Sequence, residues 1–131
     1  MVIWLIDDDE TFNFLSEKIV KASGYFEKVT VFLEPEKALG EITKKIKKPE
    51  ELPDLILLDI MMPRMNGFQF LEKFSAIKKN SLTKVAMLTS SLEETDKKRA
   101  FEFDYVFDFI AKPFTRAKLE DVVRNFHSTK K

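Results

Sequence analysis

Short apolar runs alternate with amphipathic stretches along the chain, and each run stops abruptly at polar residues. The run of residues 2–6 is apolar throughout and ends at Asp7, and the run of residues 55–58 ends in the same way at Asp59. A run without polar positions is typical of a strand buried on both faces of a sheet. We therefore predict strands at residues 2–6, 29–33, 55–58, 84–88 and 105–111.

Apolar residues at intervals of three and four predict a helix after each of these strands. Gly24 is placed to end the first helix, and Thr115 is placed to cap the last one. Most of the thirteen phenylalanines fall at core-facing spacing. The helices are expected at residues 10–23, 35–46, 68–77, 93–103 and 115–126, and the first carries Phe12, Leu15, Ile19 and Val20 at helical spacing.

The regular alternation of strand and helix indicates an α/β fold, a doubly wound five-stranded parallel sheet with five helices. The chain of 131 residues has the length of one domain, and no repeat or linker interrupts it, so we expect a single domain over residues 1–131. Hydrophobic residues make up 44% and charged residues 34%, which is ordinary for a globular protein.

The composition excludes several classes of function. The 22 basic and 22 acidic side chains cancel, so we expect no nucleic-acid binding within this chain. The absence of cysteine excludes disulfides and thiolate metal sites, and the single histidine, His127, disfavours histidine-based zinc sites and catalysis. No apolar run is long enough to span a bilayer and no signal peptide is evident, so we expect a cytoplasmic protein without membrane contact.

Polar side chains follow four of the five predicted strands directly, and they suggest one shared site. The carboxyl ends of parallel strands meet at one edge of the sheet, where open α/β sheets bind ligands. Clustered carboxylates repel each other, and Mg²⁺ would relieve the repulsion while leaving positions for phosphoryl oxygens. One aspartate would then act as a nucleophile and form an acyl phosphate. The groups are residues 7–10 (three aspartates and a glutamate), Asp59, Thr89 with Ser90, and Lys112.

Each of these groups also has a purely structural interpretation, except one. The acids at residues 7–10 can cap a helix, Thr89 and Ser90 can form a cap or turn, and Lys112 can be a solvated lysine. Asp59 at the end of a buried strand has no such explanation, because its carboxylate needs a partner there. The coincidence of all four groups at strand ends favours a functional site.

Four segments of the chain resemble the receiver domain of two-component response regulators, close to the single-domain chemotaxis type. The resemblance covers about residues 2–126, and the segments occur in order, each at the end of the expected strand. It implies a flavodoxin-like fold with the strand order 2-1-3-4-5. The segments are LIDDD at residues 5–9, DLILLDIMMP with a following NG at residues 54–67, LTSS at residues 88–91 and FIAKPF at residues 109–114.

The resemblance implies a role for each acidic residue at the predicted edge. Asp59 would be the phosphoacceptor. Asp8 and Asp59 would bind Mg²⁺ directly, together with the backbone carbonyl of Met61. Asp7 would act mainly through a metal-bound water.

The resemblance also implies a switch. Lys112 would contact the phosphoryl group, and its bond to Pro113 is expected to be cis. Thr89 would move toward the phosphoryl group and allow the ring of Phe109 to turn inward. The fourth helix, fifth strand and fifth helix, roughly residues 93–126, would then present an altered surface to a partner.

The partners and the activity follow from the same resemblance. A histidine kinase or a histidine phosphotransfer protein would supply the phosphoryl group from a phosphohistidine, and the downstream protein target is unknown. The chain would be no enzyme beyond its own phosphorylation and slow autodephosphorylation.

Several positions depart from the usual family pattern. Tyr105 and Val106 stand where a Gly-Ala pair is common, which leaves the end of the fourth helix open. Phe109 lacks the hydroxyl of the commoner tyrosine. Met61 and Ser91 occupy positions that tune hydrolysis in the family, without fixing a lifetime here.

Two alternatives stay open. Residues 7–11 also fit the Asp-x-Asp-x-Thr signature of haloacid-dehalogenase-like phosphatases, with Asp7 as nucleophile and Asp9 as acid and base, although this leaves Asp59 unexplained. The chain could also be an interaction module that binds partners without phosphorylation. The chain ends soon after the fifth predicted helix, so a stand-alone receiver and a fragment of a longer protein are both compatible with it.

Overall fold

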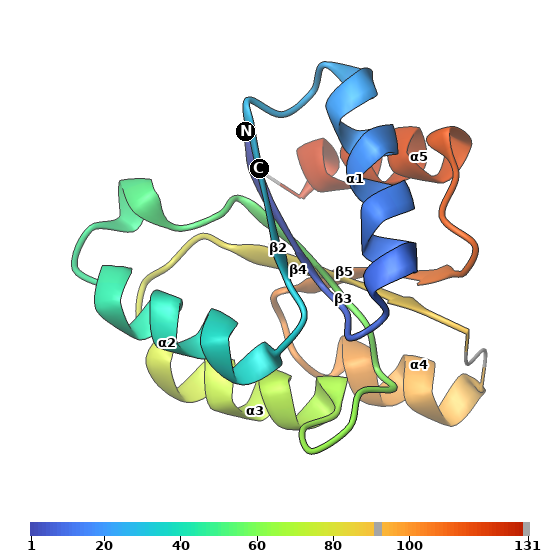
Figure 1. The fold of residues 1–131 in the computed structure, drawn as a ribbon. Coiled ribbons are helices and arrows are strands. Elements are labelled where there is room, and N and C mark those ends of the chain that lie inside the picture. Colours follow the sequence, from blue (N-terminus) through green and yellow to red (C-terminus); the bar gives the residue numbers. More distant parts are fainter. Residues whose placement is uncertain (91–92, 130–131) are drawn as a thin grey trace.

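The sheet has the predicted number, direction and order of strands. A computed structural model describes residues 1–90 and 93–129, and within them five parallel strands pair in the order β2-β1-β3-β4-β5 (Figure 1). The register places Ile6 beside Phe32 and Leu58, so the carboxyl ends of three strands are level. The strands are β1 (Val2–Ile6), β2 (Lys28–Phe32), β3 (Leu55–Leu58), β4 (Lys84–Thr89) and β5 (Val106–Ala111).

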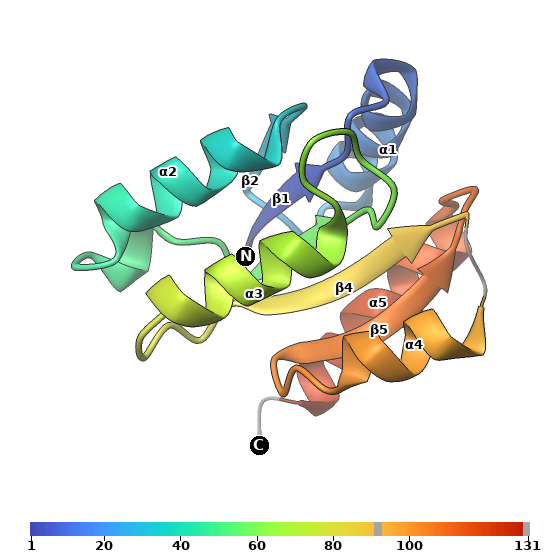
Figure 2. The same cartoon turned by 90° about the horizontal axis from the view of Figure 1, so that it is seen from below.

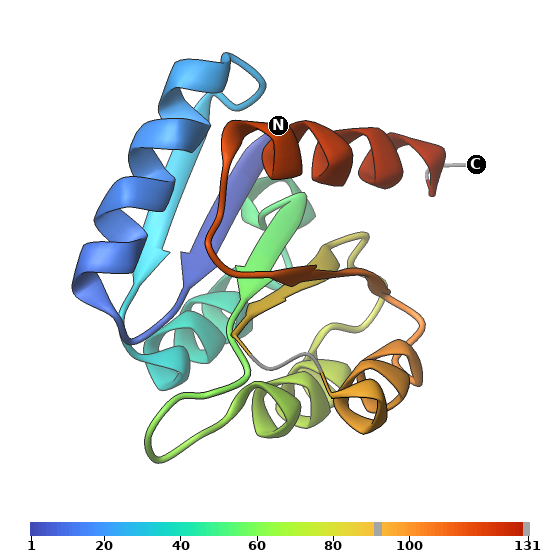
Figure 3. The ribbon, with the colours of Figure 1, turned by 90° about the vertical axis from the view of Figure 1, so that its right-hand side faces the viewer.

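Five α-helices in the described part of the chain cover both faces of this sheet. Helices α1 and α5 lie on one face, and α2, α3 and α4 lie on the other (Figures 2 and 3). Each face buries its own hydrophobic cluster against the sheet, which explains why the strands are apolar throughout. The helices are α1 (Glu10–Ser23), α2 (Pro35–Lys45), α3 (Gly67–Ile77), α4 (Glu94–Phe101) and α5 (Arg116–Ser128), and a short 3-10 helix, η1 (Pro49–Glu51), lies in the loop before β3.

Two residues predicted to end or cap a helix, Gly24 and Thr115, are confirmed in these roles. The Thr115 side chain accepts a hydrogen bond from the backbone N–H of Lys118 and caps α5. Gly24 ends α1 with a φ of 77°, a left-handed conformation that glycine adopts without steric cost. The structure differs from the prediction at α4, which ends at Phe101 instead of residue 103. No helix among the described residues is both long and apolar enough to cross a membrane.

The predicted inward face of α1 is wrong in one respect. Leu15, placed on the apolar face by its spacing, is 55% exposed, and so is its neighbour Phe14. The helix instead buries Asn13, Ser16 and Val20. Asn13 and Ser16 are polar, so hydrophobicity does not explain their burial, and their position depends on the groups that they contact inside the protein. Phe101 on α4 is also exposed, so the expectation that the phenylalanines are core residues fails at two positions.

Tyr105, one of the departures from the family pattern, ties the segment between α4 and β5 to α3. Its buried hydroxyl donates to the Leu71 carbonyl at 2.6 Å and contacts the Ser75 hydroxyl at 2.7 Å. Its ring meets Phe74 edge-on, with 5.1 Å between the ring centroids. Burial of the phenol raises the pKa of Tyr105 to about 12. The larger side chain thus adds contacts with α3 that a Gly-Ala pair cannot make.

Tyr105→Phe should lower the free energy of unfolding by about 1 to 2 kcal/mol, because the Leu71 carbonyl loses its donor in a buried place. Urea unfolding followed by circular dichroism measures this change. Tyr25→Phe is the matched control, since Tyr25 is exposed and should change stability by less than about 0.5 kcal/mol. Equal effects of the two substitutions would contradict this role of the Tyr105 hydroxyl.

Candidate functional site

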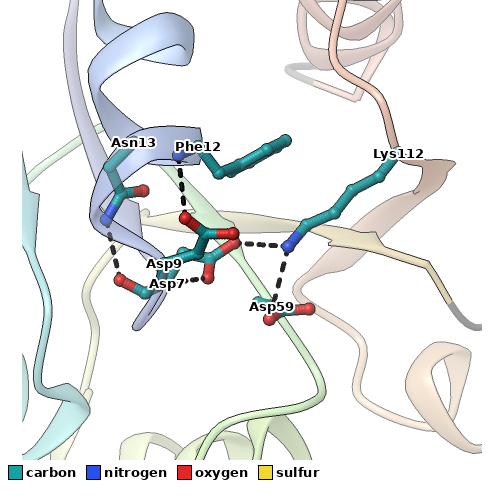
Figure 4. A network of polar contacts seen from close by, with 6 residues as sticks. All are labelled: Asp7, Asp9, Phe12, Asn13, Asp59 and Lys112. Carbon is teal, nitrogen blue, oxygen red and sulfur yellow. Dashed lines mark hydrogen bonds and ion pairs between the residues drawn. The ribbon is translucent and has the colours of Figure 1, made fainter.

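Asp7, Asp59 and Lys112 meet at the carboxyl edge of the sheet, as the strand ends predicted (Figure 4). The Lys112 Nζ lies 2.7 Å from Asp7 Oδ2 and 3.5 Å from Asp59 Oδ2. Asp7 and Asp59 are buried, and Lys112 is largely covered. Two carboxylates therefore share one ammonium group in a place with little access to bulk water.

The acidic cluster has the donor set of a small hard cation. One carboxylate oxygen from each of Asp7, Asp8 and Asp59 lies within 4.8 Å of the others, and Asp8 is the exposed member. Asp59 Oδ1 is buried and makes no hydrogen bond within the described residues. Carboxylate oxygens, of which those of Asp8 are exposed to solvent, suit Mg²⁺, which keeps several waters when bound. The residues present thus fit the predicted metal.

Burial and mutual repulsion disfavour the charged form of both inner aspartates. Burial, followed by the negative charge of Asp7, raises the pKa of Asp59 to about 6 in spite of Lys112. Burial likewise raises the pKa of Asp7 above its ordinary value. Burial alone would lower the pKa of Lys112, but its contacts with Asp7 and Asp59 outweigh this and raise it. Lys112 therefore stays charged, but its single positive charge can balance only one of the two carboxylates.

The other predicted residues lie at the end of β4, on β5 and in the segment after β3. Thr89 is fully buried at the end of β4, and its carbonyl accepts a hydrogen bond from the backbone N–H of Lys112 at 2.9 Å. Phe109 is half-buried on β5, and its ring packs against the core cluster under α3 and α4. The Met61 side chain is 65% exposed. The Lys112–Pro113 bond is cis, as expected, and Ser91 lies outside the described residues.

The start of α3 packs directly against the backbone of the phosphoacceptor candidate. A Cβ atom at Gly67 would lie 2.6 Å from the Asp59 carbonyl oxygen, closer than real Cβ contacts allow. The Gly67 N–H donates to the Ile60 carbonyl at 2.9 Å. Asn66 and Gln69 form a capping box that fixes this end of α3. The glycine therefore lets the helix hold the turn that follows Asp59.

The sequence patterns missed two residues of the first helical turn. The Phe12 ring lies under the Lys112 ammonium, with Nζ 4.2 Å from the ring centroid, and Asn13 donates to the Asp7 carbonyl at 2.7 Å (Figure 4). Asp9 caps α1 by accepting from the Phe12 N–H at 3.0 Å. Asn13, a polar residue between apolar positions of α1, was the available signal in the sequence, because a buried polar side chain needs a hydrogen-bond partner inside the protein.

Comparison with known proteins shows the family. A model of the response regulator receiver domain matches residues 3–124, so the chain belongs to this family. The transcriptional regulatory protein CpxR of Escherichia coli is 31% identical over 129 residues, covering 95% of this chain and 50% of CpxR. A solved two-component response regulator from Cytophaga hutchinsonii superposes with a TM-score of 0.85 at 27% identity, covering 97% of this chain and 96% of that one.

The family assignment settles the coarse function. The chain is a receiver domain of phosphorylation-based two-component signalling, and its fold is the flavodoxin-like one that the resemblance implied. One relative, protein-glutamate methylesterase/protein-glutamine glutaminase 3 of Burkholderia thailandensis, is 33% identical over 111 residues, covering 85% of this chain and 29% of that protein. The chain spans half or less of the length of these curated relatives.

Asp59→Asn should stabilise the metal-free protein at neutral pH by roughly 1 to 3 kcal/mol, because it removes one of two buried, repelling carboxylates. Since the pKa of Asp59 rises from 3.8 to about 6 on folding, the folded state holds this proton more tightly than the unfolded chain. The free energy of unfolding of the wild type should therefore fall as the pH rises from 3.8 to about 6. In Asp59→Asn most of this dependence on pH should be lost. Urea unfolding without divalent cations across the window measures both effects. A wild-type stability that rises over the same range would contradict the raised pKa.

Proposed function

We propose that Asp59 is the phosphoacceptor of this receiver domain. The observation that carries the proposal is the position of the Asp59 carboxylate at the end of β3, with Lys112 Nζ 3.5 Å from Oδ2 and with Oδ1 free of hydrogen bonds within the described residues. A carboxylate oxygen attacks the phosphorus of a phosphohistidine, the P–N bond breaks, and the imidazole leaves with the electron pair. The product is an acyl phosphate on Asp59.

Lys112 and the acidic cluster would serve this transfer electrostatically. The Lys112 ammonium, which now contacts both Asp7 and Asp59, is placed to pair with a phosphoryl oxygen. Its positive charge would then balance part of the negative charge of the phosphoryl group. Asp8 and Asp59, the Met61 carbonyl, and Asp7 through a water would hold Mg²⁺. When bound, Mg²⁺ supplies charge neutralisation for the phosphoryl oxygens. This assignment of roles rests on the cluster geometry and on the family.

The switch proposal uses Thr89 and Phe109. Thr89 ends the strand between those of Asp59 and Lys112, so a hydroxyl there is placed to follow a phosphoryl group. Phe109 is half-buried on β5, where it pairs with Met87, two residues before Thr89, and a rotation inward would use the space that a moving Thr89 leaves. Asp108 joins β5 to α5 by accepting from the Phe109 N–H and the Asn125 side chain, at 2.9 and 2.8 Å. The surface of α4, β5 and α5 would carry the signal.

The remaining proposals concern the setting of the domain. A histidine kinase or histidine phosphotransfer protein would donate the phosphoryl group, and a downstream protein would bind the switched surface. The chain would have no enzymatic activity beyond its own phosphorylation and slow autodephosphorylation. The single domain over residues 1–131 and the cytoplasmic location stay predictions.

Incubation with Mg²⁺ and acetyl phosphate should add one phosphoryl group to the wild-type protein, as read by intact mass. Asp59→Asn should abolish this gain because it removes the nucleophile. Asp54→Asn is the matched control, since Asp54 precedes the same strand at its far end, where its carboxylate accepts from the Val2 N–H at 2.8 Å. That variant should label normally.

Other outcomes of the labelling experiment select the alternatives. Labelling that survives Asp59→Asn and disappears in Asp7→Asn would overturn the proposal in favour of a haloacid-dehalogenase-like reaction at Asp7. A wild-type protein that accepts no phosphoryl group from acetyl phosphate or from a phosphohistidine donor would overturn it in favour of a phosphorylation-independent interaction module.

Mg²⁺ should raise the thermal stability of the folded protein, by about 2.7 kcal/mol at one hundred times its dissociation constant. Asp8→Asn should remove most of this effect, because it removes one of the three carboxylates of the acidic cluster. Glu10→Gln is the control, since Glu10 is an exposed acid nearby that lies outside the cluster. Thermal unfolding with increasing Mg²⁺ measures the shift, and equal shifts in wild type and Asp8→Asn would exclude this metal site.

A further inference from the structure

A small cavity lies against the acidic site, between α1 and the sheet. Its volume is about 10 Å³, and its polar lining comes from Asp7, Asn13, Ser16 and Asp59. Apolar side chains of β1, β3 and β4 and the ring of Phe12 complete the wall. The cavity therefore sits between the second turn of α1 and the strand ends that carry the two buried carboxylates.

Three buried polar atoms of residues lining this cavity have no hydrogen-bond partner within the described residues: Asp7 Oδ2, Ser16 Oγ and Asp59 Oδ1. Asp7 Oδ2 has its ion-pair contact with Lys112 at 2.7 Å, which leaves Ser16 Oγ and Asp59 Oδ1 for the cavity. Ser16 is only 2% exposed, so bulk water cannot satisfy its hydroxyl. A buried polar group without a partner costs free energy, and such groups are rare in folded proteins. Their coincidence at one cavity points to a shared ligand.

The behaviour of a second serine on the same helix shows that this arrangement is specific to Ser16. Ser23 lies about two turns further along α1, and its Oγ donates to the Val20 carbonyl at 2.6 Å. A serine within a helix either points to solvent or bonds to a carbonyl of the preceding turn, as Ser23 does. Ser16 makes no such bond, so its hydroxyl is available to the cavity.

The size and chemistry of the cavity fit one water molecule. About 10 to 15 Å³ is the least volume that holds a water, and a buried water needs two to four polar partners. A hydroxyl can both donate and accept, and each carboxylate oxygen can accept twice. A water here can bond to Ser16 and donate to Asp59 from behind, while the open side of the carboxylate remains available.

We propose that this cavity binds one structural water, held by Ser16 and donating to the Asp59 carboxylate, and that Ser16 is thereby a positioning residue for phosphoryl acceptance. The role of Ser16 in positioning rests on the proposed function of Asp59, whereas the water site does not. A fixed hydrogen bond from the buried side restricts rotation of the carboxylate and aims its other lone pairs at the edge where the phosphoryl group arrives.

The water site is tested without any phosphorylation. Crystal structures at a resolution that shows ordered solvent are compared for wild type, Ser16→Val and Ser23→Ala. Wild type and Ser23→Ala should show one water within hydrogen-bond distance of Ser16 Oγ and Asp59, and Ser16→Val should exclude it. Oxygen-17 relaxation dispersion should count one fewer long-lived water in Ser16→Val. A dry wild-type cavity, with Ser16 Oγ bonded to a helix carbonyl, would overturn the site.

The positioning role is tested by the rate of phosphorylation as a function of acetyl phosphate concentration. Ser16→Val should lower the maximal rate by about tenfold while leaving the half-saturating concentration unchanged, because donor binding does not involve the cavity. Ser16→Ala keeps the space for water and should lose less, and Ser23→Ala should lose nothing. An unchanged maximal rate in Ser16→Val would refute the role.

Two controls keep these outcomes separate. Thermal unfolding shows whether each variant folds, and if Ser16→Val does not fold, the maximal rate of Ser16→Ala decides, since any loss relative to Ser23→Ala requires the hydroxyl. If wild type itself accepts no phosphoryl group on Asp59, the proposed function fails, and the crystal structures still decide whether the water is bound.

Discussion

Two buried carboxylates share one ammonium group at the carboxyl edge of the sheet, and the site depends on this imbalance of charge. Lys112 lies closer to Asp7 than to Asp59, at 2.7 and 3.5 Å, and burial raises the pKa of both acids. A buried site with excess negative charge costs stability, which a cation relieves. The same imbalance therefore explains why the acids are costly in the free protein and why they suit a metal and a phosphoryl group.

The strand order is what brings these charges together. Asp7 and Asp59 follow neighbouring strands, β1 and β3, so they are adjacent as soon as the parallel register forms. Lys112 follows β5, which is separated from β3 by β4, so its side chain must cross the end of the intervening strand to reach Asp59. Thr89 ends that intervening strand. A sheet in which β1, β3, β4 and β5 were not neighbours in this sequence would place the same four residues apart.

The first helix shows how the site shapes the packing around it. Asp9 caps α1 directly after the acidic strand end, so the first turns of the helix stand beside Asp7. Asn13 then reaches the Asp7 carbonyl, and Ser16 faces the cavity behind it. Leu15 is left on the outside, although its spacing is apolar. Polar contacts with the site, and not hydrophobicity alone, set which side of α1 is buried.

The sequence by itself determined the strands and their parallel arrangement, because these follow from local patterns of hydrophobicity. It also determined the cap of α5 at Thr115 and the end of α1 at Gly24, because these follow from local capping and turn chemistry. It also placed Asp7, Asp59 and Lys112 at strand ends. Only the tertiary structure decided which residues of α1 point inward, since that depends on partners far away in the chain. The contact of Phe12 with Lys112 and the anchoring of Tyr105 by α3 are of the same kind. Each needs two segments that no local pattern relates.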